Sequence, residues 1–191
     1  MFGTKNGKGK EYSNGKLIFE GKYLNGEKWN GKGYNNKQVK YELKEGKGYI
    51  KEYYSWNEQL EFEGEYLNGK RNGKGKEYDY NSKLKFEGEY LYDEKRKGKL
   101  YINNKLEYDG EYLYKKKWNG KGYDENLNII YELINGNGQG KEYDCNGKLK
   151  FEGECLNGKR NGIGKEYDDN VGETEYKNGE ICRQDMVGSI W

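Results

Sequence analysis

The sequence predicts an all-β fold: an elongated, single-layer antiparallel sheet built of tandem β-hairpins. A short aromatic motif recurs roughly every 20 to 24 residues, and apolar and charged residues alternate within each copy. Asn-Gly dipeptides, which favour tight hairpin turns, follow several copies directly. The composition agrees, because 30 Gly and 21 Tyr with no Ala and no Pro favour strands and turns over helices.

The first repeated motif joins an aromatic residue to an acidic residue and a glycine. Its clearest copy is Phe-Glu-Gly-Glu-Tyr-Leu at 86–91. Full copies begin at Phe19, Phe62, Tyr108 and Phe151, shortened copies begin at Tyr41 and Tyr131, and a last weak copy contains Tyr176. The chain therefore contains eight units.

Each copy of this motif reads as one half-buried strand. Leu84, Phe86, Gly88 and Tyr90 fall on one face of the strand, and charged residues fall on the other. A second motif, Gly-Lys-Gly-Lys-Glu-Tyr at 7–12 and 73–78, lies between copies of the first and predicts the other strand of each hairpin. We expect rings to lie across the gaps left by the strand glycines, so that one unit is one hairpin.

The units are arranged as a block of four, copied once. Gly21 and Gly110 are 89 residues apart, as are Trp29 and Trp118. We expect one continuous repeat array over 1–191, with four units in 1–95 and their second copy in 96–184. The tail at 185–191 breaks the repeat and is interpreted either as a short C-terminal cap or as a linear motif; its apolar members are Met186, Val187, Ile190 and Trp191.

Charge and composition exclude several classes of function. The net charge is +2, which argues against a nucleic acid partner. The chain has no His, so no His-containing triad and no His-ligated metal site can form. We expect no metal and no cofactor. No apolar run is long enough to span a membrane.

Three cysteines without paired spacing favour a reducing, cytoplasmic environment over a disulfide framework. Cys155 replaces a tyrosine of the repeat, so we expect it to be buried and inert. Cys145 falls at a turn and Cys182 in the tail, and nothing in the sequence predicts a reactive thiol at either position.

Catalysis is not predicted. Glu63 and Glu65, or Glu87 and Glu89, could act as an acid–base pair, but the pair recurs with the repeat. Recurrence favours a solvated face on which lysines pair with these carboxylates across the strands. The Gly-Lys-Gly strings lack the Ser or Thr of a phosphate-binding loop.

The repeats resemble those of the MORN family. The resemblance rests on Tyr/Phe-Glu-Gly-Glu-Tyr followed by Asn-Gly-Lys-Arg-Asn-Gly-x-Gly, and it covers residues 7 to about 179. Tyr or Cys155 stands where the family usually has Trp, and Leu43 and Leu133 replace the central Gly. The resemblance implies a single-layer sheet that acts as a scaffold for protein contacts or self-association. It also implies, as the alternative, peripheral binding to anionic phospholipid membranes. The expected location is the cytoplasm, either free or peripheral to a membrane or a cytoskeletal structure.

An aromatic stripe offers a candidate surface for a protein partner, because Tyr and Trp are enriched in binding hot spots. Stacking of these rings within the sheet is the competing interpretation. Trp29 and Trp118 either cap a hairpin edge or contact a partner. The candidate residues are Phe19, Tyr23, Trp29, Phe62, Tyr66, Phe86, Tyr90, Tyr108, Tyr112 and Trp118.

Two basic clusters offer the candidate surface for anionic lipid. Nearby carboxylates argue for a solvated rim instead. The clusters are Lys95, Arg96 and Lys97, and Lys115, Lys116 and Lys117.

Overall fold

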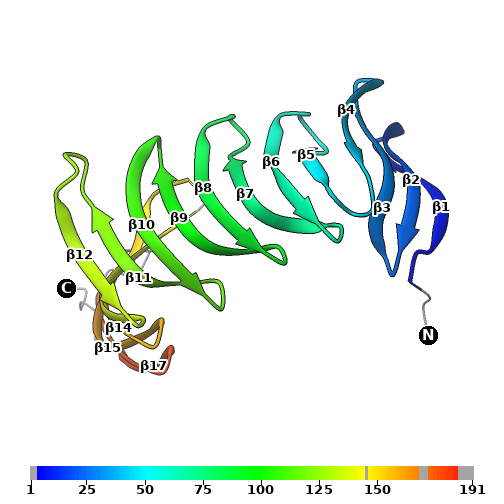
Figure 1. The fold of residues 1–191 in the computed structure, drawn as a ribbon. Coiled ribbons are helices and arrows are strands. Elements are labelled where there is room, and N and C mark those ends of the chain that lie inside the picture. The colour runs from blue at the N-terminus through cyan, green and yellow to red at the C-terminus, as the bar shows by residue number, and fades with distance from the viewer. Residues whose placement is uncertain (1–3, 145, 168–171, 185–191) are drawn as a thin grey trace. The chain divides into compact units, whose positions relative to one another are not determined.

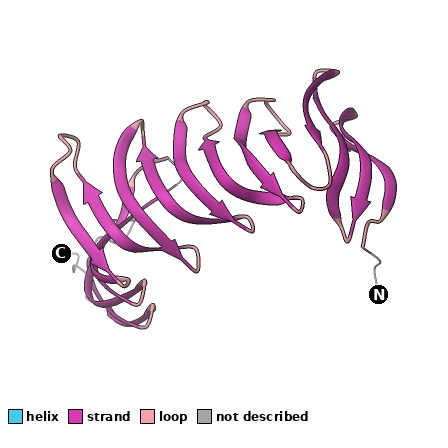
Figure 2. Cartoon of the chain, viewed as in Figure 1, coloured by secondary structure: helices cyan, strands magenta, loops and turns pink. Residues whose placement is uncertain are grey.

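The structure is a computed structural model that describes residues 4–144, 146–167 and 172–184. All regular elements in these ranges are strands, and consecutive strands are hydrogen-bonded neighbours except at one break, between the fourth and the fifth strand (Figure 2). The predicted single-layer antiparallel sheet of tandem hairpins is confirmed. The chain forms two compact units, Met1–Gly98 and Lys99–Trp191. The predicted C-terminal cap and Cys145 lie outside the described residues.

The first unit begins with a four-stranded sheet in the order β1-β2-β3-β4, and β5 starts the next sheet (Figure 1). Its strands are β1 (Gly7–Ser13), β2 (Lys16–Leu24), β3 (Glu27–Asn35), β4 (Gln38–Leu43), β5 (Gly48–Tyr53), β6 (Leu60–Leu67), β7 (Lys70–Tyr78) and β8 (Leu84–Leu91). The boundary between the units falls within β9 (Glu94–Ile102).

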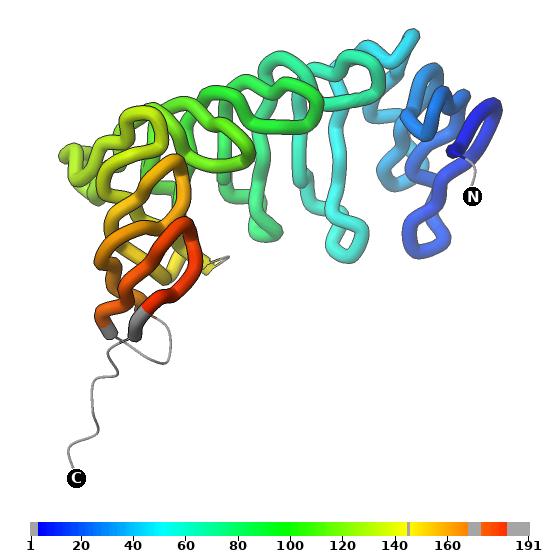
Figure 3. The backbone as a smooth tube through the Cα atoms, turned by 90° about the horizontal axis from the view of Figure 1, so that it is seen from below, coloured from blue at the N-terminus to red at the C-terminus, as the bar shows by residue number. Residues whose placement is uncertain are grey.

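The second unit continues the same pattern of hairpins. Its strands are β10 (Lys105–Leu113), β11 (Lys116–Tyr123), β12 (Ile129–Ile134), β13 (Asn137–Tyr143), β14 (Leu149–Leu156), β15 (Lys159–Glu166), β16 (Gly172–Lys177) and β17 (Glu180–Gln184). Each strand follows its sequence neighbour in hydrogen-bonded order, and the backbone trace shows the hairpins one after another (Figure 3).

Asn-Gly dipeptides make the turns where the sequence predicts them. Asn25, Asn68 and Asn157 have φ between 51° and 54°, a conformation that asparagine tolerates better than most residues. The turns are also joined sideways. The Gly69 amide donates to the Gly46 carbonyl at 2.9 Å, and the Gly158 amide donates to the Gly136 carbonyl at 2.9 Å. Successive hairpins are thereby fixed to each other at their turns.

The core is the row of motif aromatics, as stacking within the sheet predicts. Phe19, Phe62, Phe86, Tyr108 and Phe151 are fully buried. Tyrosines pack edge-on against these rings, with centroids 5.3 Å apart for Phe62 and Tyr90. A single layer has no second sheet to cover it, so the rings cover one another.

Strand glycines make room for these rings. Gly64 pairs with Gly75 across β6 and β7. A Cβ on Gly64 would lie 2.7 Å from the Gly75 Cα and 2.7 Å from the Phe62 ring. The ring therefore lies across the bare backbone, which confirms the structural explanation of the glycines.

The opposite face carries the charge pairs that recurrence predicts. Lys51 pairs with Glu63 at 3.0 Å, Lys141 with Glu152 at 3.0 Å, and Lys76 with Glu87 at 3.7 Å. These carboxylates hold cross-strand lysines on a solvated face.

Candidate functional site

A cation lies over an aromatic ring of the core in five hairpins. Arg71 is opposite Tyr66 in the strand register, and Lys117 is opposite Tyr112. The distances from cation to ring centroid are 4.1 Å for Arg71 over Phe62, 4.2 Å for Arg160 over Phe151, 4.5 Å for Lys95 over Phe86, 5.0 Å for Lys28 over Phe19 and 5.1 Å for Lys117 over Tyr108. Each contact is a cation–π interaction that also shields the edge of the core.

Carboxylates from the second motif neutralise the two arginines among these cations. The Arg71 guanidinium bonds Glu52 at 2.5 Å and Glu77 at 3.2 Å, and the Tyr66 hydroxyl donates to Glu52 at 2.6 Å. Burial raises the pKa of Glu77, but Lys95, Tyr90 and Arg71 outweigh burial and leave it lowered. The fork geometry of arginine lets one cation bridge the carboxylates of two strands.

Lys117 occupies the most enclosed of the cation sites just described. Its ammonium donates to Glu107 at 2.6 Å, to the Tyr131 hydroxyl at 2.8 Å and to the Lys141 carbonyl at 3.3 Å. The Tyr131 hydroxyl donates to the second Glu107 oxygen at 2.5 Å. Burial lowers the pKa of Lys117, and the charge of Glu107 partly offsets this shift. All three ammonium donors are therefore satisfied.

Lys28 is the counterpart of Lys117 in the first block, 89 residues earlier. It bonds Glu11 of β1 at 2.7 Å. The carboxylate that pairs with the lysine lies on a different strand in each copy. Glu11 of β1 is replaced by Leu100 in the second copy, and Ile18 of β2 is replaced by Glu107 of β10. Lys28 is thus drawn toward β1, whereas Lys117 is held by Glu107 and reaches β12 and β13.

β4 and β5 separate from each other after their connecting turn. They are joined by a single bridge between Lys44 and Lys47, and they belong to different sheets. Leu43 and Ile50 close the core beneath the turn. Past the turn, β4 ends one sheet and β5 begins the other. Each of these two strands therefore has one edge that is not hydrogen-bonded to a further strand.

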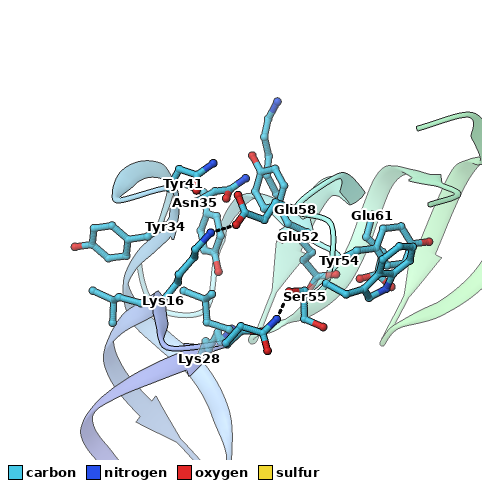
Figure 4. A pocket seen from close by; sticks show the side chains of 18 residues that line it. Lys16, Lys28, Tyr34, Asn35, Tyr41, Glu52, Tyr54, Ser55, Glu58 and Glu61 are labelled. Carbon is cyan, nitrogen blue, oxygen red and sulfur yellow. Dashed lines mark hydrogen bonds and ion pairs between the residues drawn. The ribbon is translucent and has the colours of Figure 1, made fainter. Parts of the chain in front are cut away.

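A cleft of about 430 Å³ lies where these two strands separate (Figure 4). Tyr34 and Tyr41 line it from the first sheet, and Tyr53, Tyr54 and Glu61 line it from the second. All of its lining residues belong to the first unit. The cleft is the candidate functional site.

The loop at 54–59 forms one wall of the cleft and is bonded to neighbouring segments on two sides. On one side the Asn14 amide donates to the Ser55 carbonyl at 2.6 Å, and Lys16 pairs with Glu58 (Figure 4). On the other side the Tyr54 hydroxyl donates to the Tyr78 carbonyl at 2.8 Å, and the Asn57 amide donates to the Tyr80 carbonyl at 2.9 Å. The loop is therefore bonded to the strands and turns on both of its sides.

Trp56 of this loop forms an aromatic group with Tyr54 and Tyr80, called the Trp56 group below. Trp56 is 64% exposed, and its ring lies 5.9 Å from Tyr54 and 6.0 Å from Tyr80. Rings that stay exposed next to a cleft differ from the buried rings of the core, and such patches are typical of interaction sites.

The structure places the predicted aromatic stripe in the core. Of its members, Tyr66 is half-buried and the other stripe rings are at most 7% exposed. A partner could contact these rings only if the sheet opened.

The two tryptophans pack on turns. Both Trp29 and Trp118 are half-buried, and each ring lies against the turn glycine of the following hairpin, Gly46 or Gly136. The amides of these glycines donate to the tryptophan carbonyls at 2.7 and 2.8 Å. The tryptophans cap the turn of the next hairpin rather than their own.

The predicted basic clusters are partly neutralised. Lys95 bonds Glu77 at 2.7 Å, and Lys117 is enclosed with Glu107. Arg96, Lys97 and Lys115 are exposed and Lys116 is half-buried. One cation of each cluster is therefore already paired with a carboxylate of the fold.

Cys155 is half-buried beside Gly140, and burial raises the pKa of its thiol, which lowers the thiolate fraction. The predicted burial of Cys155 is therefore only partial, and the raised pKa makes its thiol less reactive at neutral pH. Cys182 is exposed.

Sequence reasoning missed the cleft, Glu61 and the Trp56 group. The sequence did contain one feature that could have indicated this site. At the turn where other units have Asp and Asn, the segment 54–59 contains Trp56. The separation of β4 from β5 depends on strand register, which the repeat pattern does not encode.

Among the described residues, no helix has the length and apolar character needed to span a membrane. The same residues contain no cluster of His, Cys, Asp and Glu able to hold a metal ion. No family model and no curated protein matches the chain, so the resemblance to MORN repeats rests on the repeats themselves.

Proposed function

We propose that the chain is a non-catalytic, MORN-type scaffold that binds an extended segment of another protein at the open edges of β4 and β5. The observation that carries this proposal is the cleft between these edges, flanked by the exposed Trp56 group. An unpaired strand edge offers amide and carbonyl groups to an added strand, and adjacent pockets take alternate side chains.

The absence of catalysis is part of the proposal. The chain has no His, and the carboxylates that recur with the repeat bond lysines, arginines and tyrosines of the fold. Groups occupied in this way stabilise the sheet and are poorly placed to exchange protons with a substrate. The free thiols of Cys155 and Cys182 support a reducing compartment such as the cytoplasm.

The alternative proposal is binding to an anionic membrane through the two basic clusters. Pairing of Lys95 and Lys117 with Glu77 and Glu107 lowers the positive charge available for lipid. Flotation with anionic vesicles that is lost at high salt and on charge reversal of Arg96 and Lys97 would favour this alternative.

Affinity purification followed by binding measurements tests the main proposal. Proteins recovered with the full chain are identified by mass spectrometry, and their affinities are measured for Trp56→Ser and for Tyr114→Ser. Tyr114 is 78% exposed and belongs to the second unit, so it is a matched surface control. We expect Trp56→Ser to weaken binding by more than about 1 kcal/mol and Tyr114→Ser to leave it unchanged. Full affinity in Trp56→Ser for every recovered partner would reject the site.

A further inference from the structure

The cleft in the first unit has an unbalanced charge. Three lysines line it, and each has a carboxylate partner. Lys16 pairs with Glu58, Lys28 with Glu11 and Lys51 with Glu63. The positive charges of the cleft are therefore already neutralised.

One carboxylate of the cleft is left over. Glu52 bonds Arg71 and Tyr66, and Glu58 bonds Lys16. Among the described residues, no ion pair or side-chain hydrogen bond involves Glu61. Glu61 is half-buried, which makes an unpaired carboxylate costly at this position. Burial, followed by the charge of Glu52, raises the pKa of Glu61.

Strand register explains why Glu61 has no partner. The pairing of β5 with β6 shifts between Glu52 and Tyr53, so Glu61 falls in a bulge between Leu60 and Phe62. The same bulge recurs in other strand pairs, where the extra residue is Ile18, Lys40, Lys85, Ile130 or Lys150. A lysine is therefore structurally acceptable at this position, and the carboxylate of Glu61 is a local departure from the repeat.

The rings around Glu61 complete a cation site. Tyr54 lies close enough for the charge of Glu61 to contribute to its raised pKa, after burial. The Tyr54 ring also lies against Trp56 at a tilt, and Tyr34 and Tyr41 line the cleft from the other sheet (Figure 4). The protein already holds its own cations in this way, since Arg71 lies over the Phe62 ring and bonds Glu52. An aromatic wall with an unpaired carboxylate is chemically suited to a positive group.

We propose that the cleft binds the cationic side chain of a lysine or arginine in the partner segment, with Glu61 as its carboxylate and Tyr54 and Trp56 as its aromatic wall. This inference rests on the proposed function, because the cation belongs to a strand added between β4 and β5. A basic segment is favoured over an acidic one because the lysines of the cleft are paired and Glu61 is not.

Calorimetric titration with short synthetic peptides tests this inference. The probes alternate threonine and valine around a central arginine, glutamine or glutamate. We expect the arginine peptide to bind at least about tenfold more tightly than the glutamine peptide, and the glutamate peptide to bind most weakly. The Glu61→Lys variant should lose this preference and still fold, because Lys85 and Lys150 occupy the same bulge.

Glu89→Lys is the matched control, since it makes the same change of charge at an exposed residue of β8 in the first unit. It should bind the arginine peptide as the parent does. Equal affinity for arginine and glutamine peptides, with both lost in Trp56→Ser, would overturn the cation site and leave the strand-binding proposal standing. Binding of none of the peptides would overturn both. An unchanged arginine preference in Glu61→Lys would also overturn the cation site.

Discussion

The two copies of the shortened unit use the same lysine in opposite ways. In the first unit Lys28 bonds Glu11, and the strands that follow leave a cleft. In the second unit Lys117 bonds Glu107, Tyr131 and the carbonyl of Lys141, and so joins β10, β12 and β13. Moving one carboxylate from the first strand of the block to the second changes what the lysine reaches.

This difference shows how a repeat protein can differentiate its copies without altering the fold. Both copies keep an aromatic ring under the cation and a tryptophan on the turn glycine of the next hairpin, since Trp29 packs on Gly46 as Trp118 packs on Gly136. At the cation the copies differ by the exchange of Glu11 and Ile18 for Leu100 and Glu107, and of the Phe19 ring for that of Tyr108. Stability resides in the shared rings, and the distinct surface resides in a few charged side chains.

The largest expected effect is loss of the buried carboxylate in the second unit. Glu107→Ala leaves the enclosed Lys117 without its ion-pair partner, which should lower the free energy of unfolding by about 3–5 kcal/mol. Glu11→Ala should cost about 1 kcal/mol or less, because the Lys28 and Glu11 side chains are 32% and 30% exposed. Urea unfolding followed by circular dichroism measures both. Equal losses in the two variants would refute the contrast between the copies.

A smaller loss is expected from a change to the core that both copies share. Gly64→Ala places a methyl group against the Gly75 backbone and the Phe62 ring and should cost about 1–3 kcal/mol. Gly153→Ala should cost a similar amount, because its neighbours are Gly164 and Phe151.

Gly9→Ala is the control for these glycine variants. Its new methyl group would lie 3.2 Å from the ring of Tyr23 and would meet no backbone atom within 4 Å apart from its chain neighbours, so its cost should be smaller. Thermal and urea unfolding rank the three variants. A Gly9→Ala variant as unstable as Gly64→Ala would contradict the role assigned to the backbone contact.

Much of this architecture could be predicted from the sequence. Alternation in 84–90 predicts the buried face of β8, and Asn68-Gly69 predicts a turn with positive φ. These features are local, and they depend on residue type and spacing alone. The recurrence of the Glu pairs likewise predicts the lysine partners that the structure shows for Glu63 and Glu87.

The candidate site could not be predicted in the same way. The sequence shows that the rings form a row, but whether the row is core or surface depends on how closely neighbouring strands approach. The bulge that isolates Glu61 depends on the register of two strands, and the cleft depends on where β4 leaves β5. The partners of Lys28 and Lys117 likewise depend on which strand supplies the carboxylate, and the repeat motif does not show this.

The smallest expected effect is a difference in alkaline stability. Burial, with the charge of Glu107 second, raises the pKa of Tyr131 above its usual range. Above pH 10 the unfolded tyrosine loses its proton while the folded one keeps it, so stability falls as pH rises. In Tyr131→Phe this fall should be shallower by up to about 1.4 kcal/mol per pH unit.

Tyr41→Phe should show a change of the same sign in the first unit, because burial also raises the pKa of Tyr41. Urea midpoints measured between pH 8 and 11 give the slopes, and comparison with the parent chain removes the opposing contribution of Lys117. A slope unchanged in Tyr131→Phe would contradict the assigned role of burial.

Nuclear magnetic resonance of the lysine ammonium groups tests the contrast between the two copies most directly. An ammonium that is enclosed and donates to three acceptors exchanges its protons slowly with water, whereas an exposed one exchanges too fast to be seen. We expect a protected ammonium signal that disappears in Lys117→Arg and is unaffected in Lys28→Arg. A protected signal that belongs to Lys28, with none from Lys117, would contradict the conclusion that Lys117 is the more enclosed of the two lysines.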